Sequence, residues 1–341
     1  MSADRALSNP LVQHKMMFSL KWSAVLLFCC LTNPLLAAEN DTPEFLIKRM
    51  IAATSALNYE GVFVYQRGDQ IDSMRILHRV NGETEYERLV SLSGPPREVV
   101  RKGTEVRCLF ADDKEGMVGK VEPKDFLTFS LLTSVDTITN HYRLKLSGRA
   151  RIAGREARTV SIIPIENNRY AYLLAVDSEF GLLLKSAIFG SSGRVLEQVQ
   201  FANITIGHEI PMRDFEPEIS GESFTWRTSE NDSSPSSPPP KGSAWRAEWL
   251  PAGFEMRNHM VQRYASNSPP VSHMVYSDGL AMVSIFIETR TGNALPSINS
   301  HSSMGAVNAL SRVMDDHQVT VVGEVPVNTL QKIAASVSEA R

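Results

Sequence analysis

The sequence predicts an α+β protein in two parts: a large antiparallel sheet carrying a few helices, then a smaller α+β domain. Three observations predict this fold class. Between residues 59 and 206, apolar runs with a period of two are separated by short glycine turns, the pattern of an antiparallel meander. Residues 228–243 (TSENDSSPSSPPPKGS) lack apolar side chains and are typical of a linker. Helical periodicity is confined to a few segments on either side of that linker.

The N-terminus has the pattern of a secretory signal peptide. Basic residues precede the apolar run WSAVLLFCCLTNPLL (22–36), and the small residues Ala37 and Ala38 follow it. The apolar run is shorter than the roughly 20 residues that a membrane-spanning helix needs. We therefore expect residues 1–38 to be cleaved and the mature protein to be exported and soluble. The start codon stays open between Met1 and the later Met16 or Met17.

Cysteine usage fits this reading. Cleavage leaves only Cys108, so the mature chain has no internal disulfide. Cys108 lies in the strand-like run EVRCLF, which predicts a buried small hydrophobe rather than a reactive thiol. Acylation at Cys29 or Cys30 is the alternative to simple cleavage, but the preceding Leu27 and Phe28 are not small residues.

The mature chain begins with a predicted helix. Asp41 or Thr42, followed by Pro43, is a helix-start signature. Apolar residues then follow at helical spacing, at Leu46, Met50, Ala53 and Leu57. We expect this stripe to pack on the sheet.

The strands of the first domain follow directly. In LNYEGVFVYQRGDQ (57–70) apolar residues occupy both faces, and Gly61 is interpreted as a bend or bulge that helps a sheet curl. Gly68–Asp69 and Asn81–Gly82 predict hairpin turns. Residues 124–135 (KDFLTFSLLTSV) predict an inserted helix whose apolar side chains plug a concave sheet.

The second domain, residues 244–341, mixes both periods. A hairpin is predicted around Ser277-Asp278-Gly279 and a strand in QVTVVGEVP. The segment SSMGAVNALSRVMDDH predicts a helix with an apolar stripe formed by Met304, Val307, Leu310 and Met314. VNTLQKIAASVSEA predicts a closing helix.

Motifs for catalysis or cofactor binding are missing from the sequence. It holds no zinc spacing of His and Cys, no Gly-x-Ser-x-Gly, no phosphate loop and no dinucleotide fingerprint. The net charge of −3 argues against nucleic-acid binding. The run REVVRKGTEVR (97–107) is interpreted as a solvated strand face, with a local basic patch as the alternative. We therefore predict a binding protein, not an enzyme, with no metal and no cofactor.

Several segments together resemble the MucB/RseB family. In the first domain they are YEGVFVYQRGDQIDSMRILHRVNGETEYERLVSLSGPPREVVR and VLEQVQFANITIG. In the second they are WLPAGFEM, YSDGLAMVSIFIE and GAVNALSRVMDDHQVTVVGEVP. The resemblance extends from about residue 44 to about residue 326, with the linker in the expected place.

The resemblance implies both fold and function. It implies that residues 39–227 form an unclosed antiparallel half-barrel with inserted helices, similar to lipoprotein carriers, ahead of the smaller α+β domain. It implies a periplasmic regulator of the envelope-stress sigma factor that binds the periplasmic part of a transmembrane anti-sigma factor. Such proteins shield the anti-sigma factor from site-1 proteolysis, and lipid or lipopolysaccharide fragments relieve the shielding. A periplasmic lipid or lipoprotein carrier is the alternative function, and self-association stays open.

Three sets of candidate residues follow, each with an ordinary structural role as its alternative. Apolar residues expected to face a lipid cavity, or else to form core, are Phe63, Tyr65, Met74, Ile76, Phe126, Phe129 and Leu132. Aromatic or soft residues expected on the partner-binding surface, or else in the small domain's core, are Trp249, Phe254, Met256 and Phe286. Basic residues that could meet lipid phosphates or an acidic peptide are Arg97, Arg101 and Lys102.

Overall fold

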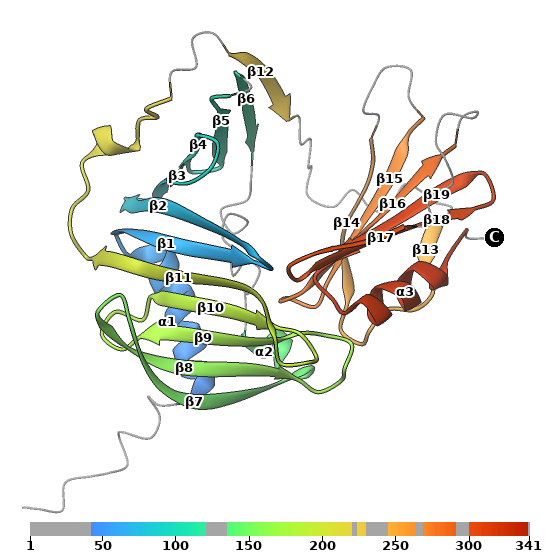
Figure 1. Cartoon of the computed structure of the whole chain (residues 1–341), viewed down its shortest axis with the longest axis horizontal. Helices are drawn as coiled ribbons and strands as arrows, with labels where there is room; N and C mark the ends of the chain where they lie inside the picture. Colours follow the sequence, from blue (N-terminus) through green and yellow to red (C-terminus); the bar gives the residue numbers. More distant parts are fainter. Residues whose placement is uncertain are drawn as a thin grey trace, which may run out of the picture. The chain divides into compact units, whose positions relative to one another are not determined.

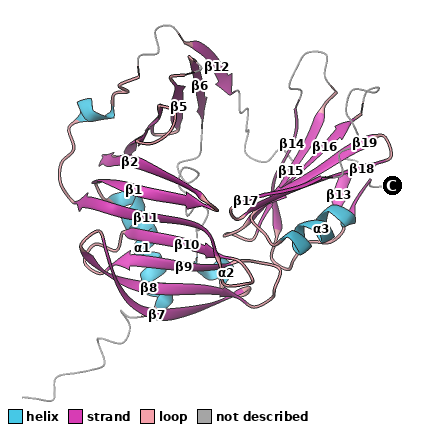
Figure 2. Cartoon of the chain, viewed as in Figure 1, coloured by secondary structure: helices cyan, strands magenta, loops and turns pink. Residues whose placement is uncertain are grey.

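Two sheets dominate the part of the chain that the structure describes. The computed structural model describes residues 42–112, 114–120, 135–219, 224–229, 245–262, 269–290 and 300–339. Within these ranges one sheet has twelve strands, a second has six, and two short strands pair separately (Figures 1 and 2). From Asp41 onward the chain forms one compact unit. The predicted signal peptide, residues 124–134 of the predicted inserted helix and residues 230–243 of the predicted linker lie outside the described residues.

The twelve-stranded sheet is antiparallel apart from one pair at its edge. Its strand order is β12-β6-β5-β4-β3-β2-β1-β11-β10-β9-β8-β7, and β12 pairs with β6 in parallel. In chain order the strands are β1 (Tyr59–Arg67), β2 (Gln70–Asn81), β3 (Thr84–Ser91), β4 (Arg97–Lys102), β5 (Glu105–Phe110), β6 (Glu115–Lys120), β7 (Tyr142–Ile152), β8 (Arg155–Pro164), β9 (Ala171–Asp177), β10 (Leu183–Phe189), β11 (Val195–Ile206) and β12 (Thr225–Ser229). The sheet curls without closing between β7 and β12, so the predicted half-barrel is confirmed.

Local signals set the turns of this sheet much as the sequence indicates. Gly68 and Gly82 adopt φ of 60° and 63° between β1 and β2 and between β2 and β3. The second turn comprises Gly82 and Glu83, one residue later than predicted, because Asn81 pairs with Thr84 at the end of the ladder. The register of β1 with β11 shifts between Val62 and Phe63, which confirms an irregularity beside Gly61.

Helix α1 (Pro43–Ala56) covers one end of the sheet, as its apolar stripe predicts. Thr42 is the N-cap, and its side-chain oxygen accepts a hydrogen bond from the backbone N–H of Phe45 at 3.1 Å. The helix packs on β7, β8 and β9. Its buried residues share a core with those strands and with the short helix α2 (Val135–Ile138), through Leu46, Ile47, Met50, Val135, Ile138, Val160, Ile162 and Leu174. We call the face that α1 covers the inner face.

The opposite, outer face is covered over β2–β4 by the segment that follows β11. The 3₁₀ helix η2 (Met212–Phe215) lies in this segment, and Phe215 packs with Leu77 and Ile210. The buried pair Arg88 and Glu98 ties the same segment to the sheet. Arg88 donates to the Asp214 carbonyl at 3.0 Å, and Glu98 accepts from the backbone N–H groups of residues 218 and 219. The segment after β11, with its short 3₁₀ helix, therefore completes the second face of these strands in place of an α-helix.

The six-stranded sheet has the order β14-β15-β16-β19-β18-β17. Its strands are β14 (Glu255–Gln262), β15 (Val271–Ser277), β16 (Met282–Thr289), β17 (Ser300–Met304), β18 (Val307–Met314) and β19 (His317–Gly323), while β13 (Trp245–Ala247) pairs with β20 (Val337–Glu339). Helix α3 (Val327–Ser336), the predicted closing helix, packs on β18 and β19, and its Leu330 and Ile333 share one core with Val319 and Val321. The predicted α+β class of the smaller domain is confirmed.

One predicted helix in this domain is wrong. Residues 300–314 form the β17–β18 hairpin, with Gly305 at φ 63° and Ala306 in its turn. The spacing of Leu310 and Met314 fits a strand face as well as a helix face, and both pack on the core of the second sheet. Gly305 in the left-handed region and pairing of β18 with β19 exclude a helix here.

Candidate functional site

The site consists of the inner face of the first sheet and the contact between the two sheets. In the described part of the chain, no three His, Cys, Asp or Glu side chains come together as a metal site. Among the same residues, no helix has the length and hydropathy of a membrane span.

Pairing across strands places the predicted cavity residues of β1 and β2 on the inner face. Residues directly opposite each other in a ladder share a face, and the pairs Phe63–Met74 and Gly61–Ile76 lie on the same side as Val199 of β11. Together with Tyr59 and Phe201, the four candidates Phe63, Tyr65, Met74 and Ile76 form one apolar cluster. Phe63 and Ile76 are buried in it, while Tyr65 and Met74 are half-buried. Phe126, Phe129 and Leu132 lie outside the described residues.

The inner face continues beyond these residues as an apolar row that sequence reasoning missed. In register, Ile76 of β2 is followed by Leu89, Val99, Cys108 and Met117 on successive strands. Leu89, Val99 and Cys108 are half-buried, and Met117 is 42% exposed. Burial raises the pKa of the Cys108 thiol, in keeping with its predicted role as a small hydrophobe. Only the strand register, fixed by the hairpin turns, could have revealed this row from the sequence.

A buried polar row lies beside the apolar one. His78, Glu87 and Arg101 are neighbours in register, and the His78 ring stacks on Tyr59 at 4.8 Å between centroids. Arg101 donates to Oε2 of Glu87 at 3.1 Å and to Oε2 of Glu85 at 2.8 Å. Burial raises the pKa of Glu87 to about 7, and the charge of Arg101 opposes that rise.

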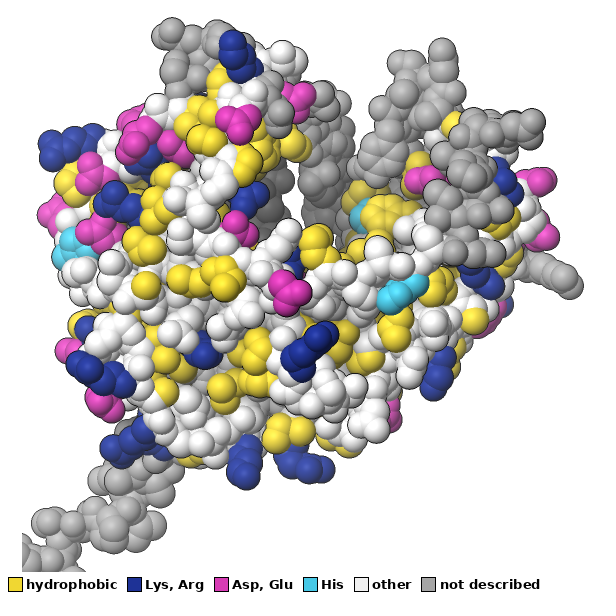
Figure 3. Space-filling model, in the orientation of Figure 1, with side chains coloured by type: hydrophobic (Ala, Val, Ile, Leu, Met, Phe, Trp, Pro, Cys, Tyr) yellow, Lys and Arg dark blue, Asp and Glu magenta, His cyan; other side chains and the backbone are white. Residues whose placement is uncertain are grey.

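This arrangement corrects the predicted basic patch. Arg101 is 3% exposed and its charge is paired inside the protein, so it does not belong to an exposed patch. Arg97 and Lys102 are exposed, but Lys102 lies on the face opposite to Arg101 because adjacent strand residues alternate. On the surface shown in Figure 3, the Lys and Arg side chains over the region of β2–β6, at the upper left, lie beside acidic ones and form no single basic cluster.

The predicted partner-binding residues fall into two groups. Trp249 and Met256 are exposed at 36% and 42%, as a partner surface requires. Phe286 is half-buried and stacks on His273 at 4.1 Å. Phe254 is 7% exposed and belongs to the core of the second sheet, which is the alternative that the sequence left open for it. Its ring faces the guanidinium of Arg169 at 5.2 Å.

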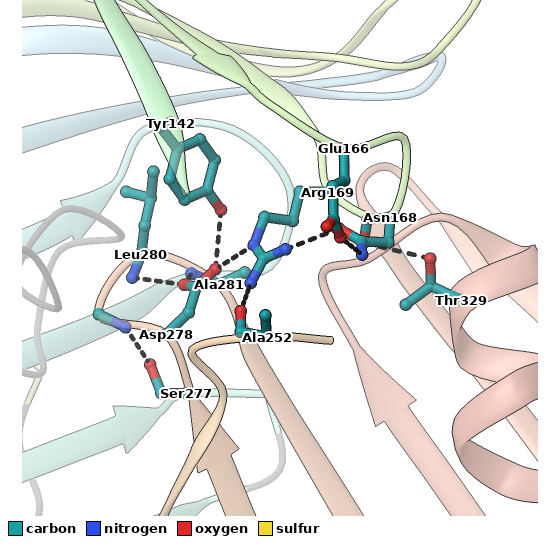
Figure 4. A network of polar contacts seen from close by, with 11 residues as sticks. Tyr142, Glu166, Asn168, Arg169, Ala252, Ser277, Asp278, Leu280, Ala281 and Thr329 are labelled. Carbon is teal, nitrogen blue, oxygen red and sulfur yellow. Dashed lines mark hydrogen bonds and ion pairs between the residues drawn. The ribbon is translucent and has the colours of Figure 1, made fainter. Parts of the chain in front are cut away.

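A buried ion pair joins the two sheets (Figure 4), close to α2, whose Thr137 and Ile138 lie beside Gly279. Arg169, before β9, donates through Nε to Oδ2 of Asp278 at 2.6 Å, and Tyr142 of β7 donates to the same oxygen at 3.0 Å. Arg169 also donates to the carbonyl of Ala252 and, at 2.7 Å, to the side chain of Asn168. Leu280, beside Asp278, is part of the core of the first sheet.

Further polar contacts extend this junction toward α3. Asn308 of β18 donates to the Tyr170 hydroxyl at 2.9 Å and to the Val325 carbonyl at 2.8 Å. Thr329 of α3 donates to the Asn168 carbonyl at 3.1 Å. Three glycines of the second part of the chain meet the first sheet or α2 closely. A Cβ at Gly253 would clash with His141, one at Gly279 would touch Thr137, and one at Gly305 would clash with Arg67 and Glu197.

No local sequence pattern predicts this junction. Arg169 and Asp278 are 109 residues apart, and the local sequence predicts only that Asp278 belongs to a hairpin turn. This prediction is correct, because Oδ1 of Asp278 accepts hydrogen bonds from the backbone N–H groups of Leu280 and Ala281. One carboxylate therefore holds its own turn and binds the other sheet.

Comparisons with known proteins agree on both parts of the chain. The model of the MucB/RseB N-terminal domain matches residues 42–219, and that of the MucB/RseB C-terminal domain matches residues 239–338. The sigma factor AlgU regulatory protein MucB of Pseudomonas aeruginosa is 31% identical over 309 residues, covering 87% of this chain and 90% of that protein. The sigma-E factor regulatory protein RseB of Haemophilus influenzae is 28% identical over 318 residues, covering 93% and 98%.

Solved structures match over the same length. The crystal structure of MucB in complex with MucA(peri) is 28% identical and superposes with a TM-score of 0.69, covering 87% of this chain and 98% of that one. A crystal structure of MucB superposes with a TM-score of 0.60 at 27% identity, covering 86% and 96%. Both sheets of the present chain thus have counterparts in one known protein.

Proposed function

Because the chain belongs to the MucB/RseB family, we propose that it binds the periplasmic segment of a transmembrane anti-sigma factor and shields it from site-1 proteolysis. It thereby restrains an envelope-stress sigma factor, and lipid or lipopolysaccharide fragments release the restraint. The protein acts by binding and not by catalysis, and it acts in the periplasm after its signal peptide is removed. We further propose the division into residues 39–227, a linker over 228–243 and residues 244–341, except that Thr228 and Ser229 belong to strand β12 of the first domain.

One observation carries the proposal. The structure of MucB in complex with MucA(peri) shares both sheets with this chain at 28% identity. An anti-sigma segment is the partner that this likeness supports. Trp249 and Met256 are exposed soft or aromatic side chains of the kind that anchor such interfaces.

The inner face supports a lipid as the second ligand. The apolar row of Leu89, Val99, Cys108 and Met117 continues from the buried cluster around Phe63 and ends at an exposed methionine. α1 packs on β7–β9, at the other end of the sheet. An acyl chain lying along the row would remove apolar surface from water, at about 25 cal/mol per Å².

In this proposal, lipid releases the anti-sigma segment through thermodynamic linkage between the two binding events. A lipid lowers the affinity for the anti-sigma segment only by as much as it prefers the form that does not hold that segment. The coupling is reciprocal, so bound anti-sigma segment must weaken lipid binding by the same factor. This equality can be measured directly.

The test is a reconstituted cleavage assay. Purified mature protein, the periplasmic segment of the anti-sigma factor and the site-1 protease are combined, and the half-life of the segment is followed with and without lipopolysaccharide. Protection that lipopolysaccharide removes is the expected result. No change in the half-life on adding the protein would overturn the proposed shielding.

A matched pair of variants separates the two ligands. Met117→Glu places a charge on the apolar row and is expected to preserve protection while making it resistant to lipid. Met212→Glu makes the same change at a similarly exposed site, 37% against 42%, on η2 over the outer face, and should respond to lipid as the wild type does. If both variants respond alike, lipid does not use the inner face.

A periplasmic lipid or lipoprotein carrier is the second candidate. The apolar row alone favours it, whereas the second sheet, docked through a buried ion pair, is not needed by a simple carrier. Transfer of an acylated cargo between two vesicle populations, without any effect on cleavage of the anti-sigma segment, would favour the carrier.

A further inference from the structure

The contact between the two sheets has two ends that differ in how fully their charges are paired. We propose that the junction is a pH-dependent latch, in which Arg169 and Asp278 form the fixed end and Glu197 and Glu324 form the end that loosens as the pH rises. The proposal concerns how the two sheets stay docked and does not depend on which partner the protein binds.

The fixed end is fully satisfied. Oδ2 of Asp278 accepts from Arg169 and Tyr142, and Oδ1 accepts from Leu280 and Ala281. The side chains of Arg169 and Asp278 are 1% and 0% exposed. Both oxygens of the Asp278 carboxylate therefore have two donors each, and the charge of Arg169 lies directly against it.

The other end brings the β17–β18 turn against β1 and β11. Glu197 of β11 is 5% exposed, accepts from the Tyr65 hydroxyl at 3.1 Å and accepts from the backbone N–H of Ala306. A Cβ built on Gly305 would lie 2.6 Å from Oε1 of Glu197 and 2.5 Å from Cγ of Arg67. Ala306 is fully buried in the core of the first sheet. The turn is therefore seated directly on the Glu197 carboxylate.

Glu324 adds a second carboxylate at this end. It follows β19, and its backbone N–H donates to the carbonyl of Met282 at 3.1 Å. Among the ion pairs of the described residues, none within 4.0 Å includes Glu197 or Glu324. The groups that face them are the hydroxyls of Tyr65 and Tyr172 and the cation of Arg67.

Burial and the charge of Glu197 raise the pKa of Glu324 to about 7. The pKa of Glu197 is also raised by burial, against the opposing hydrogen bonds from Tyr65 and Ala306 and the charge of Arg67. Undocking would return both carboxylates to water and to ordinary pKa values near 4.5. A carboxyl group whose pKa is higher in the docked form than in the undocked form stabilises docking, and this stabilisation is fully present when the pH is below the undocked pKa. It is lost as the pH rises toward the docked pKa of about 7.

The measurement is hydrogen exchange of the full mature chain, read by mass spectrometry as protection factors between pH 5 and pH 8. Peptides covering residues 300–310 report the latch. We expect their protection to fall on the order of tenfold or more across this range. Protection that stays constant in wild-type protein would overturn the proposal.

Glu324→Gln removes the titrating charge and keeps the shape. It should hold the protection of residues 300–310 at pH 8 near the wild-type value at pH 5 and flatten the pH dependence. Glu255→Gln, an exposed glutamate on the same sheet, should leave the wild-type pH dependence intact. The same pH dependence in Glu324→Gln and wild type would also overturn the latch.

A second pair of variants tests the contact itself. Gly305→Ala pushes a methyl group into Glu197 and Arg67, whereas Gly82→Ala has the same φ of 63° and meets nothing within 4 Å. Both bear the same backbone strain at their own turns, so a larger loss of protection over residues 300–310 in Gly305→Ala than over residues 78–88 in Gly82→Ala belongs to the junction. Equal losses in the two variants would show that the turn is not seated on Glu197.

Discussion

Arg169 donates to Asp278 across 2.6 Å from one sheet to the other, and neither side chain is more than 1% exposed. The guanidinium also lies over the rings of Tyr142 and Phe254, at 5.7 and 5.2 Å. One arginine thus contacts strand β7, the turn before β14 and the β15–β16 turn. Removing one partner leaves a buried charge without compensation, which is more costly than losing an exposed pair.

We expect Asp278→Ala to lower the free energy of unfolding by about 3–5 kcal/mol, because the Arg169 charge is left buried and unpaired. Chemical denaturation in urea measures this change. Arg75→Ala, which breaks an exposed pair with Glu60, is the control and should cost less than about 1 kcal/mol. Similar losses in the two variants would contradict the special role of the buried pair.

Arg101→Ala should destabilise the protein rather than weaken lipid binding. It leaves Glu87 buried beside Glu85, at a cost of about 3–5 kcal/mol near pH 8. The pKa of Glu87 is raised to about 7 even with Arg101 present, so the carboxyl takes a proton as the pH falls. The loss of stability should therefore be smaller at pH 5 than at pH 8.

Urea denaturation of Arg101→Ala at the two pH values checks whether the loss of stability is smaller at pH 5 than at pH 8. Lys102→Ala changes the neighbouring, exposed basic residue and should have little effect on stability at either pH. If Arg101→Ala unfolds at the wild-type urea concentration and instead loses lipid affinity, Arg101 would be a ligand-binding residue after all.

Gly61→Ala tests the bend in β1. A Cβ at Gly61 would lie 2.4 Å from the Asn203 carbonyl oxygen, and the backbone there cannot move without disturbing the β1–β11 ladder. We expect a cost of about 1–3 kcal/mol. Gly190→Ala meets only the flexible side chain of Leu196, at 3.3 Å, and should be near neutral. Thermal unfolding of both variants distinguishes them.

We expect Phe254→Ala to lower stability and Trp249→Ala to lower affinity for the anti-sigma segment. Phe254 is core, so its truncation should cost about 3–5 kcal/mol of stability. Trp249 is exposed, so Trp249→Ala should fold normally and weaken binding of the anti-sigma segment by tenfold or more if it is an interface anchor. Calorimetric titration with that segment measures the second effect, and unchanged affinity would remove Trp249 from the interface.

Local signals in the sequence predict the parts of the fold that depend on neighbouring residues. The cap at Thr42, the stripe of α1 and the turns at Gly68 and near Gly82 all involve residues within a few positions of each other. The resemblance adds the order of the domains, which no local pattern contains. It also supplies the partner.

The errors arise where one pattern fits two structures. Met304, Val307, Leu310 and Met314 have helical spacing, but Leu310 and Met314 also share a strand face, and Gly305 decides for a turn. Arg101 looks like a surface charge until its register with Glu87, 14 residues away, is known. The junction depends on contacts between residues 83 or more positions apart, which periodicity does not encode.

The position of β1 in the sheet has a consequence for how the protein reaches its fold. β1 pairs along one edge with β2, the strand that directly follows it. Along its other edge it pairs with β11, whose residues lie about 140 positions later in the chain. Closing so long a loop is entropically costly, and high contact order slows folding. As the chain is made from its N-terminus, β1 through β6 exist for some time with an open edge in the middle of the future sheet. Arrival of β11 closes that edge and joins the two halves of the barrel wall.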